Sequence, residues 1–188
     1  MKKIFKFILL ISLFYSFFAI NANASEIYHK NKLEKYFTEL KNSKNLDQAI
    51  NIEKYIWSLW NLHPKDEFLT NKLKLGTELM ENGQHKYAYK IFSNIIFDDP
   101  NWSEAWNKRA TVLFLMKEYD LSLIDIEKTL NLEPRHFGAL SGRAQIYINQ
   151  KEYKKALDNL IQTKKIYPLS KGNNIIPTLE KILNIEEI

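Results

Sequence analysis

The chain has 188 residues, of which 45% are apolar and 26% charged, a balance that is typical of a folded protein and excludes wholesale disorder. It contains no cysteine, which excludes a disulfide framework, a thiolate nucleophile and a cysteine-based zinc site. Three of the 27 basic residues lie within the first six positions, and the remaining 24 nearly balance the 22 acidic residues. Because only three of the basic residues are arginine, the charge does not indicate nucleic-acid binding.

Residues 1–24 have the three zones of a secretory signal peptide. A short positive start is followed by 14 uncharged residues, Phe7 to Ile20, and then by small residues at Ala22 and Ala24. We expect cleavage between Ala24 and Ser25, which predicts a periplasmic or secreted protein. The alternative is an uncleaved membrane anchor over residues 4–20. Fourteen helical residues rise only about 21 Å, against a hydrocarbon core of roughly 30 Å.

Residues 25–68 are predicted to form a degenerate helix pair that caps the N-terminal end of the protein. Apolar residues recur at helical spacing on both sides of a polar break over 42–45. They are Leu33, Tyr36, Phe37 and Leu40, then Ala49, Ile52, Tyr55, Ile56 and Leu59. Trp57 and Trp60 lie three residues apart on the second helix, where we favour core packing over an exposed binding platform.

A period of 34 residues runs through the next part of the chain. Pro100, Pro134 and Pro168 divide it into three units, 69–102, 103–136 and 137–170. Small residues recur at two places in each unit, and a large apolar residue follows the second. These residues are Gly76, Ala110 and Ala144; Ala88, Ser122 and Ala156; and Phe92, Ile126 and Leu160. Facing small residues let two antiparallel helices approach closely, so the sequence predicts an all-α protein built of helix pairs.

This pattern resembles the tetratricopeptide repeat, and it is also similar to short exported bacterial proteins of that family. Unit two carries the signature at Trp106, Ala110, Leu113, Tyr119, Ser122, Ile126 and Pro134. Unit three carries it at Leu140, Ala144, Tyr147, Tyr153, Ala156, Leu160 and Pro168, and unit one departs from it at Lys72. The resemblance implies an α-solenoid, a superhelix of about nine helices, closed by a capping helix within 171–188.

The resemblance also implies a concave groove that binds an extended or helical segment of a protein partner. The candidate groove residues are Thr77, Met80, Asn107, Thr111, Phe114, Ser141, Gln145 and Ile148. Only Asn107 has the residue type that the family's carboxylate clamps use at the corresponding places, so such a clamp is not expected. Arg109 and Arg143 share one place in successive units. We favour a structural role for them over ligand binding, with Asp125 as the natural partner of Arg109.

No catalytic residue, metal site or cofactor is predicted. The four histidines (His29, His63, His85 and His136) include no pair at helical ligand spacing, and the sequence lacks HExxH, GxSxG and glycine-rich phosphate motifs. We therefore expect a non-catalytic interaction scaffold in the bacterial periplasm. The alternatives are an accessory protein that binds an envelope polymer such as peptidoglycan, and a self-assembling structural protein. The sequence leaves the partner and the oligomeric state open.

Overall fold

The computed structural model describes residues 24–186, and every regular element within them is helical. The all-α prediction and the predicted number of helices are confirmed. A helix over 24–41 is followed by α2 (Leu46–Trp60), α3 (Glu67–Glu81), α4 (His85–Asp98), α5 (Ser103–Leu115), α6 (Tyr119–Leu132), α7 (Phe137–Asn149), α8 (Tyr153–Ile166), the 3₁₀ helix η1 (Lys171–Ile175) and α9 (Ile176–Glu186). Residues 1–23 of the predicted signal peptide over 1–24 lie outside the described residues. No helix within 24–186 is both long and apolar enough to span a bilayer.

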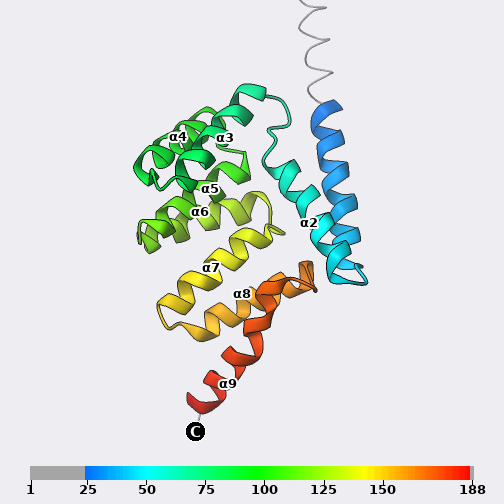
Figure 1. The fold of residues 1–188 in the computed structure, drawn as a ribbon, viewed down its shortest axis with the longest axis vertical. Helices are drawn as coiled ribbons and strands as arrows, with labels where there is room; N and C mark the ends of the chain where they lie inside the picture. The colour runs from blue at the N-terminus through cyan, green and yellow to red at the C-terminus, as the bar shows by residue number, and fades with distance from the viewer. Residues whose placement is uncertain (1–23, 187–188) are drawn as a thin grey trace, which may run out of the picture.

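Three antiparallel pairs, α3–α4, α5–α6 and α7–α8, are stacked one after another (Figure 1). Helix α5 contacts its own partner α6, the preceding helix α4, and the first helices α3 and α7 of both neighbouring units. The first helices therefore form a continuous inner layer, and the second helices form the outer layer. Each second helix ends two residues before the repeating proline, at Asp98, Leu132 and Ile166, because proline cannot continue a helix.

The turn within each pair has the same left-handed residue at the same repeat place. Gly83, Lys117 and Lys151 have φ angles of 74°, 65° and 61°. In the first turn the amide of Gln84 donates to the carbonyl oxygen of Leu79 at 2.8 Å, closing a Schellman motif. Only the first unit has glycine at this place, the one residue that adopts this conformation without a steric cost.

The small residues predicted to let helices approach do so in the structure. A Cβ atom added at Gly76 would lie 2.6 Å from the ring of Phe92, so unit one combines the smallest residue with the largest filler. Ala110 and Ile126 belong to one hydrophobic cluster, and Ala144 and Leu160 belong to another. Gly76 is buried, and the other residues named here are at most 3% exposed.

The N-terminal helix pair lies along the edge of the array where the inter-unit turns are found (Figure 1). Its core residues Phe37, Ile56 and Trp60 pack in one cluster with Phe137, at the start of α7, and with Tyr167, just after α8. The sequence led us to expect a cap on the end of the stack. The aromatic face of the pair is instead buried against the aromatic residues of the turns. At the C-terminal end of the array, α9 packs on α8.

Candidate functional site

The inner layer contains a pocket of about 140 Å³ between α5, α6 and α7. Its floor consists of small or aliphatic residues that are buried, and its rim includes two exposed polar residues, Thr111 and Gln145. The lining residues are Asn107, Ala110, Thr111, Phe114, Ser122, Ile126, Gly138, Ala139, Gly142, Gln145 and Ile146. The pocket is therefore largely apolar, with hydrogen-bonding groups at its edges.

Four of the eight predicted groove residues line this pocket: Asn107, Thr111, Phe114 and Gln145. The other four lie elsewhere. Met80 and Ile148 are half-buried against the hydrophobic clusters of units one and three. Thr77 donates its hydroxyl to the carbonyl oxygen of Leu73 at 2.9 Å, and Ser141 is half-buried in α7. The inner face is thus hollowed between units two and three, and the predicted groove residues of unit one do not line that hollow.

Asn107 is only 8% exposed because it belongs to a buried polar network at the start of α5. Its Nδ2 donates to Oε2 of Glu104 at 3.2 Å, and Nε2 of His136 lies 2.9 Å from the same oxygen. The Nδ1 atom of His136 accepts a hydrogen bond from the backbone amide of Ala139, so Nε2 is the nitrogen that donates to Glu104. Glu104 and His136 are fully buried. This network fixes the side chain of Asn107 at the edge of the pocket.

The N-terminal pair covers the part of the inner face that lies next to this network. The ring of Trp60 stacks on the ring of His136, with centroids 3.9 Å apart and planes 8° from parallel. Trp57 approaches α7 so closely that a Cβ atom at Gly138 would lie 2.5 Å from its ring. Trp60 is 3% exposed, which confirms core packing for this side chain. A partner can therefore reach only the part of the inner face that Trp57 and the rest of the N-terminal pair leave uncovered.

Arg109 has the structural role that the sequence favoured. Its guanidinium donates to both carboxylate oxygens of Asp125, at 2.7 and 2.8 Å, and to the hydroxyl of Ser93 at 3.1 Å. It also lies over the rings of Tyr89 and Trp106, 5.6 and 5.0 Å from their centroids. The hydrogen bonds to Asp125 raise the pKa of Arg109 above its ordinary value. The side chain therefore connects α4, α5 and α6.

Arg143 occupies the same place in unit three, but its partner is neutral. Its Nε atom donates to Oδ1 of Asn159, the residue that corresponds to Asp125. In unit one the same two places hold Leu75 and Ile91. In successive units these two places thus hold two apolar residues, an ion pair and a neutral hydrogen-bonded pair.

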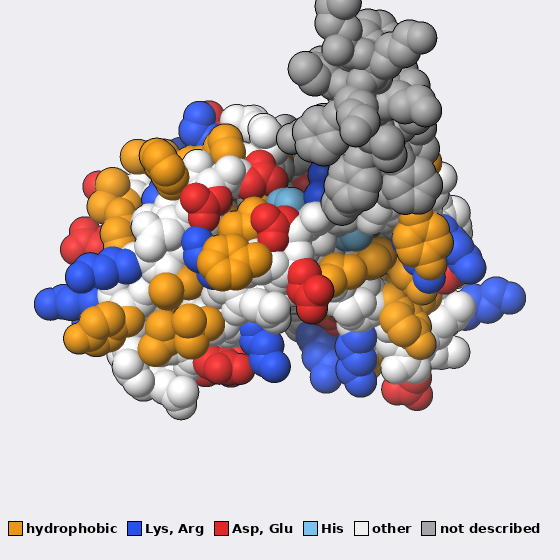
Figure 2. All heavy atoms as spheres, turned by 90° about the horizontal axis from the view of Figure 1, so that it is seen from above, with side chains coloured by type: hydrophobic (Ala, Val, Ile, Leu, Met, Phe, Trp, Pro, Cys, Tyr) orange, Lys and Arg blue, Asp and Glu red, His pale blue; other side chains and the backbone are white. Residues whose placement is uncertain are grey.

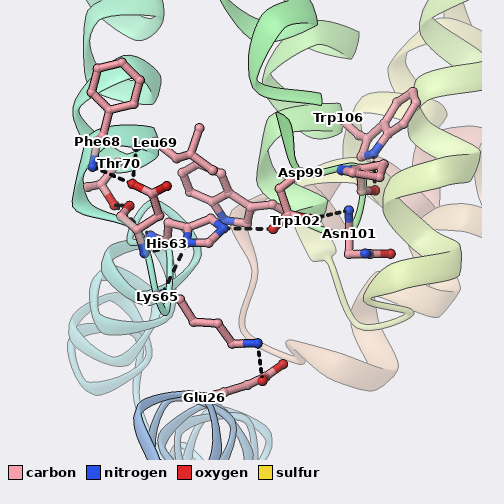
Figure 3. A network of polar contacts seen from close by, with 12 residues as sticks. Glu26, His63, Lys65, Phe68, Leu69, Thr70, Asp99, Asn101, Trp102 and Trp106 are labelled. Atoms are coloured by element: carbon pink, nitrogen blue, oxygen red, sulfur yellow. Dashed lines mark hydrogen bonds and ion pairs between the residues drawn. The ribbon is translucent and has the colours of Figure 1, made fainter. Parts of the chain in front are cut away.

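A second histidine–carboxylate pair ties the linker before α3 to the turn after α4 (Figure 3). The Nε2 atom of His63 lies 2.8 Å from Oδ2 of Asp99, and its Nδ1 accepts a hydrogen bond from the backbone amide of Asp66 at 2.9 Å. The ring of His63 also packs edge-on against Trp102, whose Nε1 donates to the carbonyl oxygen of Trp60 at 3.0 Å. This turn therefore also helps hold the N-terminal pair in place.

Sequence reasoning missed these two histidine networks, although the repeat contains a signal for one of them. Trp102 and His136 stand 34 residues apart, at the same place in successive units, and both contact Trp60. That place in the family pattern sits in the turn, so two large buried rings there indicate an element packed against the turns. Among residues 24–186 no group of three or more histidine, aspartate or glutamate residues could hold a metal ion.

Surface charge is mixed on the face shown in Figure 2, where acidic and basic side chains alternate with hydrophobic ones.

Comparison with known proteins identifies the repeats. The chain is 36% identical over 129 residues, 69% of its length, to a TPR repeat-containing protein of Rhizobium etli. Its repeats are tetratricopeptide repeats. The chain spans 61% of the length of that relative. No family model matches the chain.

Solved tetratricopeptide-repeat structures share the fold at low sequence identity. One is the first TPR of Spaghetti (RPAP3) bound to an HSP90 peptide, with a TM-score of 0.59, 15% identity, and coverage of 62% of this chain and 93% of that one. Another is the Yersinia enterocolitica type III secretion chaperone SycD in complex with a peptide of the translocator YopD. It has a TM-score of 0.59, 12% identity, and coverage of 65% and 97%. Both of these proteins are bound to a peptide.

Proposed function

We propose that this tetratricopeptide-repeat protein is a non-catalytic scaffold that binds a segment of another protein on its inner face. The pocket between α5, α6 and α7 is the observation that carries the proposal, because four groove residues predicted from the sequence converge on it. The peptides bound by the two similar folds support a protein ligand over other ligand classes.

The chemistry of the pocket suits a segment with an apolar side chain and a free backbone amide. Ser122 donates its hydroxyl to the carbonyl oxygen of Ala110, and Thr111 donates its own to that of Asn107, so the hydroxyl protons are already used. The amides of Asn107 and Gln145 are engaged through their nitrogen atoms, with Glu104 and Asn149. Their carbonyl oxygens can accept a hydrogen bond from a backbone N–H of the bound segment.

We also propose that the protein acts in the bacterial periplasm, on the strength of the charged, apolar and small-residue zones over 1–24. Cell fractionation together with mass spectrometry of the N-terminus tests this proposal. A periplasmic species that begins at Ser25 supports it. An intact N-terminus in the membrane fraction supports the anchor over residues 4–20, and an intact N-terminus in the cytoplasm contradicts both.

Site-specific photo-crosslinking in cells tests the groove. Thr111 and Gln145 are the sites for the crosslinker because they are exposed at the rim, whereas Asn107 is buried and holds Glu104. Lys128, an exposed residue of the outer helix α6, is the matched control. We expect one discrete protein adduct from each rim site and none from Lys128. Adducts to glycan alone would favour an envelope polymer as the ligand, and equal adducts from all three sites would contradict the groove proposal.

A further inference from the structure

Three glycines lie within α3 and α7, and the structure gives a packing reason for two of them. A Cβ atom at Gly76 would lie 2.6 Å from the ring of Phe92, and one at Gly138 would lie 2.5 Å from the ring of Trp57. Both distances are too short for any larger residue without movement of the ring. These two glycines are therefore explained by the fold itself.

Gly142 has no such reason. A Cβ atom there would meet a single neighbour, the Cδ1 atom of Ile126, at the ordinary contact distance of 3.9 Å. Its φ angle is not positive, so the backbone does not require glycine. The same repeat place holds Lys74 in unit one and Lys108 in unit two, which shows that the fold accepts a side chain there. Glycine inside a helix is nevertheless the least stable choice after proline.

The space left by Gly142 opens into the pocket. Gly142 and Ile126 both line it, so the bare helix face of α7 forms one wall and the Ile126 side chain forms part of the floor. Ala110 and Ala139 are also small and also line it. The absence of a side chain at Gly142 widens the pocket and is not required for packing. The reason for glycine at this position is therefore the group that enters the pocket.

We infer that Gly142 is a specificity-determining residue that admits one branched aliphatic side chain, of the size of leucine, from the bound protein segment. This inference rests on the proposed function and names the chemistry of its ligand. The volume of about 140 Å³ suits one such side chain, and the buried floor of Ala110, Ile126 and Ile146 is apolar. A lysine or glutamate side chain would lose its hydration there without an opposite charge among the lining residues.

Methyl NMR of the full chain tests this inference directly, with the δ1 methyl of Ile126 as reporter. The probe is N-acetyl-leucine N-methylamide, and the comparison compounds are the glycine and lysine analogues. We expect a saturable shift of the Ile126 methyl with the leucine probe alone. In Gly142→Ala the shift at equal probe concentration should fall at least about fivefold. The melting temperature should rise by roughly 1–4 °C, because alanine is the better helix former.

Gly172→Ala is the matched control, since it adds the same methyl group in η1, outside the pocket. It should leave the leucine response unchanged. The inference is overturned if the wild type shows no leucine response, if Gly142→Ala responds as the wild type does, or if Gly142→Ala melts at a lower temperature. A lower melting temperature would show that Gly142 is required for helix packing.

Crosslinking from Thr111 in the Gly142→Ala background separates this inference from the proposed function. An undiminished protein adduct would support the proposed scaffold function and contradict the leucine pocket. If the wild type responds to the leucine probe but forms no protein adduct, the leucine pocket is supported and the proposed scaffold function is contradicted.

Discussion

Trp60 and His136 stack face to face, with ring centroids 3.9 Å apart, although 76 residues separate them in the chain. The imidazole of His136 also makes two hydrogen bonds, one with the amide of Ala139 and one with the buried carboxylate of Glu104. One ring therefore joins the N-terminal pair, the start of α7 and the start of α5. The inner face of the repeats and the N-terminal pair are parts of one packed unit at this point.

Replacing His136 with alanine should destabilise the protein strongly. The change would remove one hydrogen-bond donor from the fully buried Glu104 carboxylate, which keeps Asn107 and Lys108 as partners, and this costs about 1.5–3 kcal/mol of the free energy of unfolding. Urea unfolding followed by circular dichroism measures the change. His85→Ala, a half-buried histidine at the start of α4, is the control and should lie within about 0.5 kcal/mol of the wild type. A loss below about 1 kcal/mol for His136→Ala would show that Glu104 finds another partner.

Replacing both members of the Arg109–Asp125 pair should be far milder than replacing one. Arg109→Leu alone leaves Asp125, which is 2% exposed, as an unpaired buried carboxylate and should cost about 3–5 kcal/mol. Arg109→Leu with Asp125→Ile copies the Leu75 and Ile91 pair of unit one, and replacing a buried ion pair by apolar residues is often neutral. A double-mutant cycle in urea measures the difference. Additive losses in the double variant would contradict this expectation.

Substitution at the left-handed turn residues should stabilise the protein. Lys117 and Lys151 adopt φ angles near 60°, which glycine reaches without a steric cost, so Lys117→Gly should raise the free energy of unfolding by about 0.5–1 kcal/mol. Thermal unfolding measures it. Lys128→Gly, inside α6, is the control and should lower stability by about 1 kcal/mol. If Lys117→Gly instead lowers the free energy of unfolding, the Lys117 side chain makes a contact that contributes more stability than the left-handed conformation costs.

The repeats could be predicted from sequence because their signals are local and recur. The turns at Gly83, Lys117 and Lys151 follow the same 34-residue period, since left-handed residues and polar stretches act within a few residues. The partner of Arg109 was also predictable, because the two facing helices of one unit bring it opposite Asp125.

The position of the N-terminal pair could not be read from the sequence, because the contacts that hold it occur once and join distant residues. Trp57 against Gly138 is one such contact, and the hydrogen bond from Tyr167 to Glu53, 114 residues away, is another. The burial of Asn107 could not be predicted either, because it depends on the network with Glu104 and His136, two residues that are 32 positions apart. This network is the reason why a residue expected on an open groove lies at the edge of a pocket.

The contact between Tyr167 and Glu53 predicts a loss of stability at alkaline pH. The Tyr167 hydroxyl donates to Oε2 of Glu53 at 3.0 Å. Burial, and then the charge of Glu53, raise the pKa of Tyr167 well above its ordinary value of 10.0. Above pH 10 the unfolded chain releases a proton that the folded chain keeps, so the free energy of unfolding must fall as the pH rises. Below pH 10 both states hold the proton and the contribution is fully present.

Urea unfolding at pH 8 and at pH 11, for the wild type and for Tyr167→Phe, measures this contribution. Phenylalanine has no ionisable group, so the stability advantage of the wild type over Tyr167→Phe should shrink between the two pH values. Ionisation of other groups affects both proteins equally and cancels in the comparison. Tyr87→Phe is the control, because Tyr87 is 62% exposed on α4 and has no such partner among the described contacts. An advantage that is unchanged at pH 11 would show that Tyr167 ionises as readily in the folded chain as in the unfolded one.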